Sequence, residues 1–364
     1  MRMAFLILVI VHGLIHLLGF VKAFGLSEVK ELTQTISKPF GVIWLLAFIF
    51  FVMAAIMFAL NNSYWWLFGF IALGTSQVLI LFFWHDAKFG TIINVIILII
   101  AIIGYGTTSF HNKYQNEVKT ALQQTAYFPN SLLTEADIQT LPEPVKKYIR
   151  YSGSIGKPKV NNFKIEFTGK IRKNEQSEWM PFNSEQYNFM ETPTRLFFMK
   201  AAMKGLPVAG YHFFKNGVAY MDIRLLSLFK VQYQDGIEMD LSETVTFFND
   251  MCCFAPATLI DKRIKWLEVE GNKVKASFTN NNITISAWLY FNDKGELKNF
   301  ISEDRYSADA GKQIPWATPL KEYQKLNGYK LMRNAEVIYS YADRDLSYGT
   351  FKLIRIEYNC KNID

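Results

Sequence analysis

The first 110 residues of the chain alternate between long apolar stretches and short polar breaks. Four stretches contain no Asp, Glu, Lys or Arg: 4–21, 40–60, 64–84 and 91–110. Each is close to the roughly 20 apolar residues that a helix needs to cross the hydrocarbon core of a bilayer. The pattern predicts an integral membrane protein with four transmembrane helices, which precede the larger part of the 364-residue chain.

A cleavable signal peptide is the alternative interpretation of the first stretch, because Arg2 precedes it. The apolar run is longer than the core of a typical signal peptide, and no small-x-small cleavage site precedes Lys22. We therefore expect the first helix to be retained.

The polar breaks determine how the helices connect. Residues 61–63 separate the second stretch from the third, and 85–90 separate the third from the fourth. Connections this short join antiparallel neighbours, so a compact four-helix bundle is expected. The first connection, 22–39, is longer. We expect a short amphipathic helix at the membrane surface there, from the spacing of Leu26, Val29, Leu32 and Ile36.

Basic residues near the helix ends bear on orientation. The loops contain Lys22, Lys30, Lys38 and Lys88, and the terminal side contains Arg2, Lys113 and Lys119. The positive-inside rule then gives a small preference for termini outside the cytoplasm. The expected location is the cell (inner) membrane, as a multi-pass protein with an extracytoplasmic C-terminal domain.

Polar side chains inside the apolar stretches are candidate functional groups, because an unsatisfied polar group in hydrocarbon is costly. His12 and His16 are four residues apart and share a helix face. One interpretation makes them ligands of a metal or haem. The other has them hydrogen-bond across the bundle to Ser76 or Gln77. We favour the second, and expect no metal and no cofactor.

After the fourth stretch the chain becomes polar and helical, and then changes period. A polar extension over 111–126, a capping box at Thr134 to Asp137, and Pro142 or Pro144 at the first turn of a helix through Tyr148 to Tyr151 predict a helical linker over 112–158. From Val160 the apolar positions recur every second residue, which is typical of strands. The predicted domains are therefore 1–111, 112–158 and 159–364.

Turn signals divide the last domain into strands. Pairs such as Asn216-Gly217, Asp235-Gly236 and Asn327-Gly328 separate roughly ten or eleven strand-like runs. One helix interrupts them near 240–253, where Asp240 and Glu243 form the pattern of a capping box. The fold class predicted is a four-helix membrane bundle followed by an α+β domain. That domain is a large curved antiparallel sheet or half-open β-barrel with an inserted helix.

Charge and cysteine content exclude some classes. Of 39 Lys/Arg and 32 Asp/Glu, residues 1–111 hold only five and three, and neither part has a dense basic run. We therefore expect no nucleic-acid partner. Cys252 and Cys253 are adjacent and do not favour a mutual disulfide. Buried free thiols are the favoured interpretation, and pairing of Cys360 with either one stays open.

Three segments resemble an uncharacterised bacterial membrane-protein family: Leu141 to Tyr148 (LPEPVKKY), Met203 to Val208 (MKGLPV), and Glu243 to Met251 (ETVTFFNDM) followed by Ala255-Pro256. The resemblance covers most of 140–358. The strand order and inserted helix are also similar to the half-open barrel of periplasmic lipoprotein carriers. That resemblance implies an apolar groove between the concave sheet and the helix, on the outer side of the membrane, and brings no catalytic residues.

The leading functional hypothesis is a membrane-anchored module that binds a lipid, an acyl chain or a lipidated protein. Large apolar side chains on the strands and the inserted helix are the predicted ligand-binding residues: Phe197, Met199, Phe213, Phe247, Met251, Trp288 and Tyr290. The alternative for these residues is an ordinary hydrophobic core.

Two other function classes stay open. One is an assembly or sensory partner of another membrane protein. The other is a hydrolase-type enzyme, because Glu243 and Asp250 share a helix face and Arg305 follows nearby in a charged cluster. No serine-nucleophile motif and no cysteine–histidine metal spacing is present in the sequence. We therefore favour binding over catalysis.

Overall fold

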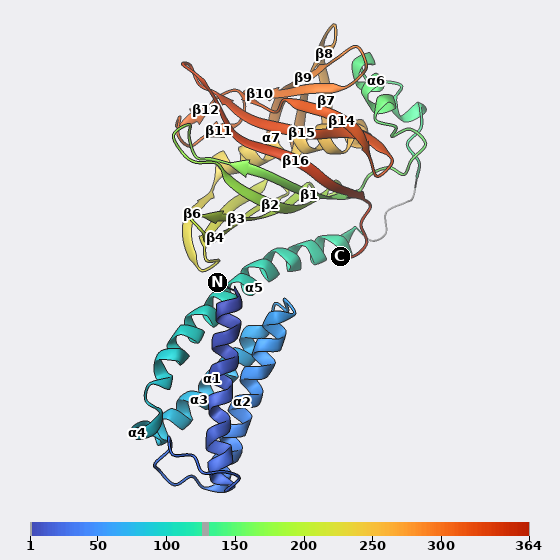
Figure 1. Cartoon of the computed structure of the whole chain (residues 1–364). Coiled ribbons are helices and arrows are strands. Elements are labelled where there is room, and N and C mark those ends of the chain that lie inside the picture. The colour runs from blue at the N-terminus through green and yellow to red at the C-terminus, as the bar shows by residue number, and fades with distance from the viewer. Residues whose placement is uncertain (1, 126–130, 364) are drawn as a thin grey trace. The chain divides into compact units, whose positions relative to one another are not determined.

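The computed structural model describes residues 2–125 and 131–363. The chain divides into two compact units, one ending at Asn112 and the other beginning at Lys113 (Figure 1).

The first unit consists of the predicted apolar helices: α1 (Arg2–Ala23), α2 (Lys38–Ala59), α3 (Trp65–Phe82) and the first part of α5 (Gly90–Gln124). A short helix, α4 (Trp84–Ala87), lies between α3 and α5. All four long helices have the length and apolar composition needed to cross a membrane. The prediction of four such helices is confirmed.

The loop between α1 and α2 differs from the prediction. Residues 24–37 contain turns and bends and no helix, so the predicted amphipathic helix was wrong. The Asp86 carboxylate accepts hydrogen bonds from the backbone N–H groups of Thr33 and Gln34 at 2.6 and 3.0 Å. Lys22 donates to the Leu32 carbonyl. These long-range partners satisfy backbone groups that a helix would otherwise pair locally.

The second unit is built on one 14-stranded sheet. Its first six strands are consecutive neighbours: β1 (Asn162–Ile171), β2 (Met180–Phe189), β3 (Thr194–Met203), β4 (Leu206–Lys215), β5 (Val218–Leu225) and β6 (Phe229–Asp235). The later strands of the same sheet are β7 (Ile264–Glu270), β8 (Lys273–Asn280), β9 (Ile283–Phe291), β10 (Leu297–Ser302), β13 (Trp316–Ala317), β14 (Leu320–Leu326), β15 (Tyr329–Ser340) and β16 (Asp345–Tyr358).

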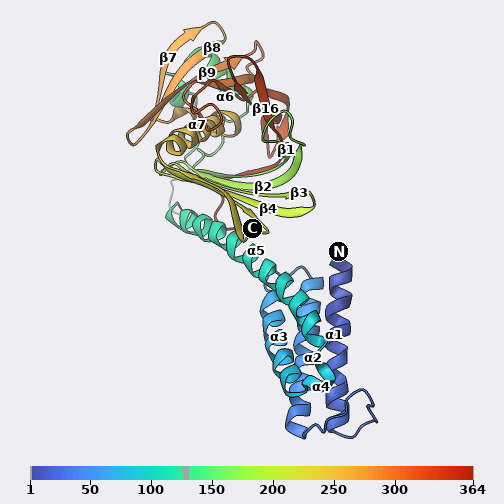
Figure 2. The same ribbon diagram turned by 90° about the vertical axis from the view of Figure 1, so that its left-hand side faces the viewer.

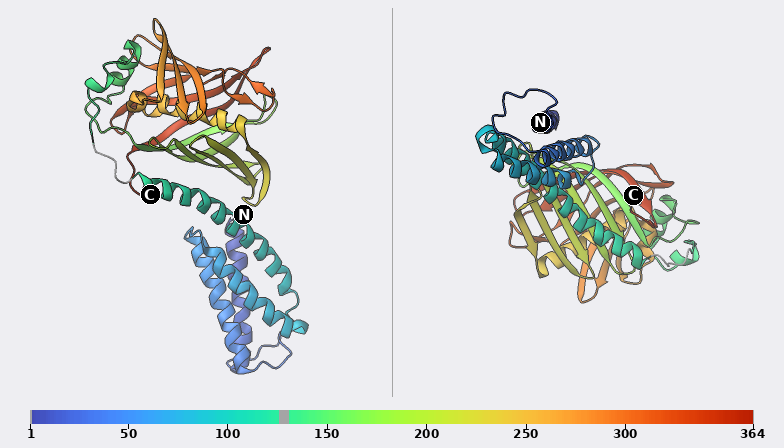
Figure 3. Two further views of the ribbon diagram at one scale, coloured as in Figure 1. Left: turned by 180° about the vertical axis from the view of Figure 1, so that it is seen from behind. Right: turned by 90° about the horizontal axis from the view of Figure 1, so that it is seen from below.

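The first and last strands of the unit join its two halves. β1 pairs antiparallel with β16, so the order runs from β6 to β1 and continues through β16, β15, β13 and β10 to β7. A small separate sheet contains β11 (Tyr306–Ser307) and β12 (Lys312–Gln313). The sheet curls, and α7 (Ile237–Phe254) lies between its two halves (Figures 2 and 3). The predicted curved antiparallel sheet with an inserted helix is confirmed.

The start of α7 corrects one detail. Gly236, with φ of 91°, precedes the helix, so Asp240 and Glu243 do not form the predicted capping box. Asp240 instead accepts the N–H of Ala219 at 2.6 Å, which connects the first turns of α7 to β5. Residues 242–254 of the helix are all buried. A short helix, η2 (Pro256–Ile260), follows it.

The segment predicted as a linker packs into the second unit. The N–H and the hydroxyl of Thr134 donate to the Asp137 carboxylate at 2.8 Å each, but Glu135 is the N-cap of η1 (Ala136–Ile138) and makes no side-chain capping bond, so the predicted capping box forms only in part. α6 (Glu143–Tyr151) follows. Tyr148 of α6 is fully buried and donates its hydroxyl to the Cys252 carbonyl at 2.8 Å. This segment therefore covers one end of the curled sheet, at the C-terminal part of α7.

The last residues of α5 also belong to this unit. Tyr114, Val118, Ala121 and Leu122 are buried, and the Tyr114 hydroxyl donates to Glu185 on β2 at 3.0 Å. Glu185 alternates with the inward-facing Ser184 and Gln186, so α5 contacts the outer face of the sheet. Helical packing therefore covers part of both sheet faces.

Candidate functional site

A group of polar side chains lies between the inner face of the sheet and α7. Side chains at every second residue of a strand share a face, so Arg195 points inward with Phe197 and Met199. Gln186 and Asn188 on β2 are the cross-strand neighbours of Phe197 and Arg195. Their partners are Glu243 and Asp250, two turns apart on α7. We call these five residues the Arg195 network: Gln186, Asn188, Arg195, Glu243 and Asp250.

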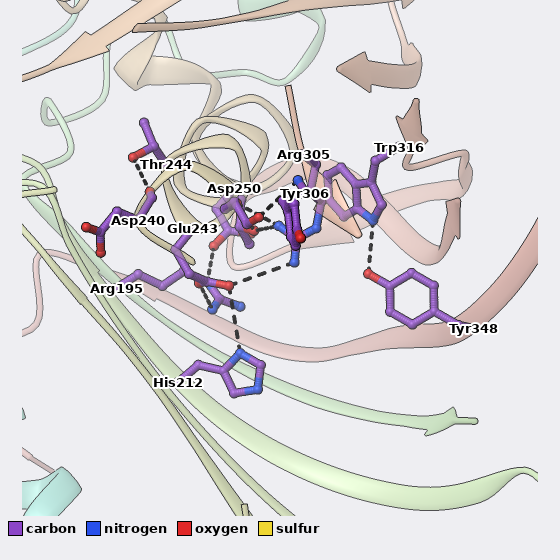
Figure 4. A network of polar contacts seen from close by, with 12 residues as sticks. Arg195, His212, Asp240, Glu243, Thr244, Asp250, Arg305, Tyr306, Trp316 and Tyr348 are labelled. Atoms are coloured by element: carbon purple, nitrogen blue, oxygen red, sulfur yellow. Dashed lines mark hydrogen bonds and ion pairs between the residues drawn. The ribbon is translucent and has the colours of Figure 1, made fainter. Parts of the chain in front are cut away.

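Arg195 is the centre of this network. Its Nε donates to Asp250 at 2.8 Å, and its Nη1 donates to Glu243 at 3.0 Å (Figure 4). The remaining nitrogen, Nη2, donates to the Gln186 side-chain oxygen at 3.0 Å. Asp250 also accepts from Gln186 at 2.7 Å and from Asn188 at 3.2 Å. The guanidinium group therefore uses all three nitrogens to connect β2, β3 and α7.

Two further side chains, Arg305 and His212, approach Glu243. The Arg305 Nη2 lies 3.8 Å from one carboxylate oxygen, and the His212 Nδ1 lies 3.8 Å from the same oxygen (Figure 4). Arg305 donates to the Ser242 carbonyl at 2.7 Å and to Thr246, and its Nε reaches the Tyr339 hydroxyl at 3.1 Å. The polar face of α7 thus contacts both halves of the sheet.

The two carboxylates have different environments. Burial alone would raise the pKa of Glu243, but the charges of Arg195, His212 and Arg305 lower it to about 2. Burial raises the pKa of Asp250, and Arg195 with the two amides opposes that shift. A general acid or base has to reach substrate, whereas Glu243 is 1% exposed and Asp250 is 5% exposed. Their shared partner, Arg195, connects α7 to β3.

Exposure on the inner face increases toward one end of the sheet. Arg195, Phe197 and Met199 are 7%, 5% and 4% exposed, but Ala201, next on the same face, is only half-buried. Other half-buried apolar side chains of the inner face lie at this end. We call the set the rim: Ala201, Ile223 and Leu225 on β3 and β5, and Val337, Tyr339 and Phe351 on β15 and β16.

The rim lies at the end of the sheet that carries the β1–β2, β3–β4, β5–β6 and β15–β16 turns. The opposite end is covered by α6. Below the rim, the side chains of His212 and Arg305 keep 22% and 13% exposure. The inner face therefore has one covered end and one end where apolar and polar groups both remain accessible.

The predicted ligand-binding residues occupy both faces. Phe197, Met199, Phe247 and Met251 are at most 5% exposed and belong to the hydrophobic core. Phe213 lies on the other face of β4, where its ring stacks on Tyr220. Trp288 and Tyr290 alternate with the buried Ala287 and Leu289 and so also face outward, with Lys273 over the Trp288 ring.

The predicted polar residues do come together, with one partner that sequence reasoning missed. Glu243, Asp250 and Arg305 converge on one region, but Arg195 makes the closest contacts to both carboxylates. The sequence did contain a signal for Arg195. This residue occupies an inward position in a strand that is otherwise apolar on that face, and a buried cation requires a partner.

A second polar cluster lies inside the helix bundle. His16 bonds through Nε2 to the Ser76 hydroxyl at 2.9 Å, and His12 bonds through Nε2 to the Asn94 side-chain oxygen at 2.9 Å. Asn94 also donates to Gln77 at 3.0 Å. The predicted cross-helix bonding of the two histidines is confirmed. Asn94, the missed partner, is the only Asn in the fourth apolar stretch.

Two of the cysteines, Cys252 and Cys253, lie on α7. Cys252 and Cys253 are buried free thiols, as predicted, and burial raises the pKa of both. Among the described residues no disulfide joins either one to Cys360. Over residues 2–125 and 131–363, no group of three or more His, Cys, Asp or Glu side chains has an arrangement that would hold a metal ion.

Comparisons with known proteins place the second unit in a family. Residues 131–351 match the Family of unknown function (DUF6544). No curated protein matches the chain.

Three solved structures resemble the second unit in fold. A LolA superfamily protein from Nitrosomonas europaea is 7% identical, with a TM-score of 0.35, covering 59% of this chain and 91% of that one. A putative outer membrane lipoprotein-sorting protein domain from Vibrio parahaemolyticus is 11% identical, with a TM-score of 0.33, covering 54% and 85%. A DUF1329 family protein from Desulfovibrio piger is 11% identical, with a TM-score of 0.34, covering 59% and 91%.

Proposed function

We propose a function from the chain's own residues, because the chain belongs to DUF6544, a family of unknown function. The proposal is a membrane-anchored protein whose second unit binds an acyl chain, carried by a lipid or by an acylated polypeptide. The acyl chain contacts the rim and enters the sheet from that end.

The observation that carries this proposal is the uneven exposure of the inner face. A single hydrophobic core is expected to bury its apolar side chains on all sides. Here α6 covers one end, and the rim residues on opposing halves of the sheet stay half-buried at the other. Apolar surface that remains accessible on a concave face, with few polar groups nearby, is typical of ligand sites.

The Arg195 network supports the site by holding α7 in place. Charged and polar groups on three elements fix the helix between the two halves of the sheet. The residues of the network are almost fully buried, so the ligand does not contact most of them. His212, which is 22% exposed, is the polar side chain nearest the rim on β4. Phe197 and Met199 form the buried surface below the rim, and Phe213, Trp288 and Tyr290 lie outside this site.

Membrane anchoring is the second part of the proposal. Four helices have the length and composition to cross a bilayer, and the buried side chains of His12 and His16 are hydrogen-bonded inside the bundle. A bilayer location makes a membrane-derived amphiphile the ligand class most available to the rim.

Photo-crosslinking tests the acyl-chain site. We expect the full-length chain, purified in mild detergent, to be labelled by a diazirine fatty acid within peptides of β3, β5 or β15. Ala201→Phe places a large ring among the rim residues and is expected to reduce labelling several-fold. Ala202→Phe is the matched control, because Ala202 is exposed on the other face of the same strand.

The outcomes separate clearly. Equal labelling of the Ala201→Phe and Ala202→Phe variants would contradict the site at the rim. Absence of any labelling of the wild-type chain, together with no lipid retained in native mass spectrometry, would contradict acyl-chain binding altogether. Near-ultraviolet circular dichroism confirms that both variants remain folded.

A further inference from the structure

Two neighbouring hairpin turns at the rim end of the sheet carry exposed apolar side chains. In the β3–β4 turn, Met203 and Leu206 are 46% and 48% exposed. In the β5–β6 turn, Phe229 is 61% exposed. The two turns are adjacent, because the Leu226 N–H donates to the Pro207 carbonyl at 2.8 Å. We call residues 203–206 and 226–229 the paired tips.

The charge around the paired tips has one sign. Lys200, Lys204 and Lys230 are exposed beside them, and no Asp or Glu occurs in 199–210 or in 223–234. The adjacent β1–β2 connection, 172–179, contains two basic and two acidic residues and adds no net charge. Exposed apolar side chains with surrounding lysines are the composition that binds an anionic bilayer surface.

The backbone of the β5–β6 turn points to the same role. Leu226 and Ser227 have φ of 55° and 58°, a left-handed conformation that asparagine and glycine adopt far more readily than a branched apolar residue. The β3–β4 turn uses Lys204 and Gly205 in the equivalent positions. A leucine at this position costs stability and places an apolar side chain at the end of the hairpin, and such costs are concentrated at functional sites.

The second unit begins at Lys113, three residues after the last apolar stretch ends at Phe110. Lys113 belongs to the second unit, and its ammonium lies 4.5 Å from the Tyr220 ring centre on β5.

We propose that the paired tips insert into the interfacial layer of an anionic lipid bilayer, with Met203, Leu206 and Phe229 in the acyl boundary and Lys200, Lys204 and Lys230 at the phosphates. This contact puts the rim next to the source of its ligand. The inference rests on the membrane anchoring in the proposed function, but it does not require acyl-chain binding at the rim.

The test uses the full-length chain reconstituted in vesicles of phosphatidylglycerol and phosphatidylcholine. An environment-sensitive fluorophore is attached to Leu206→Cys or Phe229→Cys in a Cys360→Ser background, where the remaining native thiols, Cys252 and Cys253, are buried. The control is Lys294→Cys, an exposed turn position beside α6 at the covered end. Nitroxide lipids are expected to quench the fluorophore at 206 and 229 several-fold more than at 294.

Two variants distinguish insertion from a structural role of the turns. The double variant Lys204→Glu with Lys230→Glu is expected to lower the quenching, more in phosphatidylglycerol vesicles than in pure phosphatidylcholine. Leu226→Asn relieves the left-handed conformation and is expected to raise the melting temperature while lowering the quenching. A role confined to folding predicts no loss of quenching in Leu226→Asn.

Each outcome decides a separate question. Equal quenching at 206, 229 and 294 overturns the insertion. An emission shift that depends on the protein-to-lipid ratio without quenching also overturns it and indicates a second copy of the chain on the paired tips. Loss of the chain from vesicles in alkaline carbonate contradicts membrane anchoring itself, and labelling by the diazirine fatty acid reports on the rim alone.

Discussion

The Nε of Arg195 on β3 donates to the Asp250 carboxylate on α7 at 2.8 Å, and both side chains are at least nine-tenths buried. The same guanidinium reaches Glu243, two helical turns earlier, at 3.0 Å. One cation thus balances two carboxylates in the interior, with Arg305 and His212 farther away. Arg195 therefore connects both carboxylates of α7 to β3.

Removal of Arg195 is expected to be strongly destabilising. Arg195→Met keeps most of the side-chain volume but leaves Glu243 and Asp250 without their closest cation. Breaking a buried ion pair from one side typically costs about 3–5 kcal/mol. The measurement is the free energy of unfolding of the second unit, from urea titration followed by near-ultraviolet circular dichroism.

The control for Arg195→Met is Lys321→Met. Lys321 forms a 2.9 Å ion pair with Glu336, but its side chain is 63% exposed. An exposed pair contributes at most about 1 kcal/mol, so this variant is expected to remain close to wild type. Equal losses in the two variants would show that the Arg195 network does not hold α7.

Glu243 is expected to make the second unit sensitive to acid. Its pKa of about 2 is below the ordinary 4.5. The ionised carboxylate therefore contributes fully to the free energy of unfolding above pH 4.5, and that contribution is lost as the pH falls through 2. The shift corresponds to about 3 kcal/mol. Glu243→Gln should therefore lower the unfolding free energy at pH 7 and lose much of that effect near pH 2.

Asp250 is expected to behave in the opposite way. Its pKa is raised by burial, so the stability linked to its proton is present below the ordinary 3.8 and is lost as the pH rises through the raised value. Asp250→Asn removes that loss and keeps an oxygen for Gln186 and Asn188. At pH 7, Asp250→Asn should lower the free energy of unfolding much less than Glu243→Gln does. A larger loss for Asp250→Asn would refute the opposite pKa shifts assigned to the two carboxylates.

The hydrogen bond between His12 and Asn94 inside the helix bundle predicts a measurable interaction energy between these two residues. Asn94→Leu removes the hydrogen bonds of Asn94 to the His12 Nε2 and to the Gln77 side-chain oxygen, at a cost of about 1 kcal/mol in a membrane setting. The double variant with His12→Phe should lose less than the sum of the single variants. Melting temperatures in detergent measure this cycle, and strict additivity would exclude a direct interaction.

Close helix packing predicts unequal effects for two glycines of the bundle. A Cβ at Gly19 would lie 2.2 Å from the Trp44 ring, whereas a Cβ at Gly74 meets no atom within 4 Å. Gly19→Ala should therefore destabilise the bundle by displacing Trp44. Gly74→Ala should be neutral or stabilise by up to about 1 kcal/mol, from helix propensity alone. A melting temperature that rises for both variants would show that α1 and α2 do not pack this closely.

The candidate site was predictable only in part. Glu243 and Asp250 were identifiable because their seven-residue spacing puts them on one helix face, and the cross-helix bonds of His12 and His16 followed from their four-residue spacing. Arg195 and Asn94 were missed, although each is a polar residue at an apolar position. A buried polar group requires a partner, but that requirement does not identify which distant side chain supplies it.

The sequence alone determines the four apolar helices, the alternating strands and the helix that interrupts them, because each depends on periodicity within a short window and on the thickness of a bilayer. Only the tertiary structure decides that Gly236 rather than Asp240 precedes α7, and that Arg195 joins Glu243 to Asp250. It also decides that the rim stays half-buried. These features depend on the pairing of β1 with β16 and on burial between two halves of one sheet, and such contacts join residues far apart in the chain.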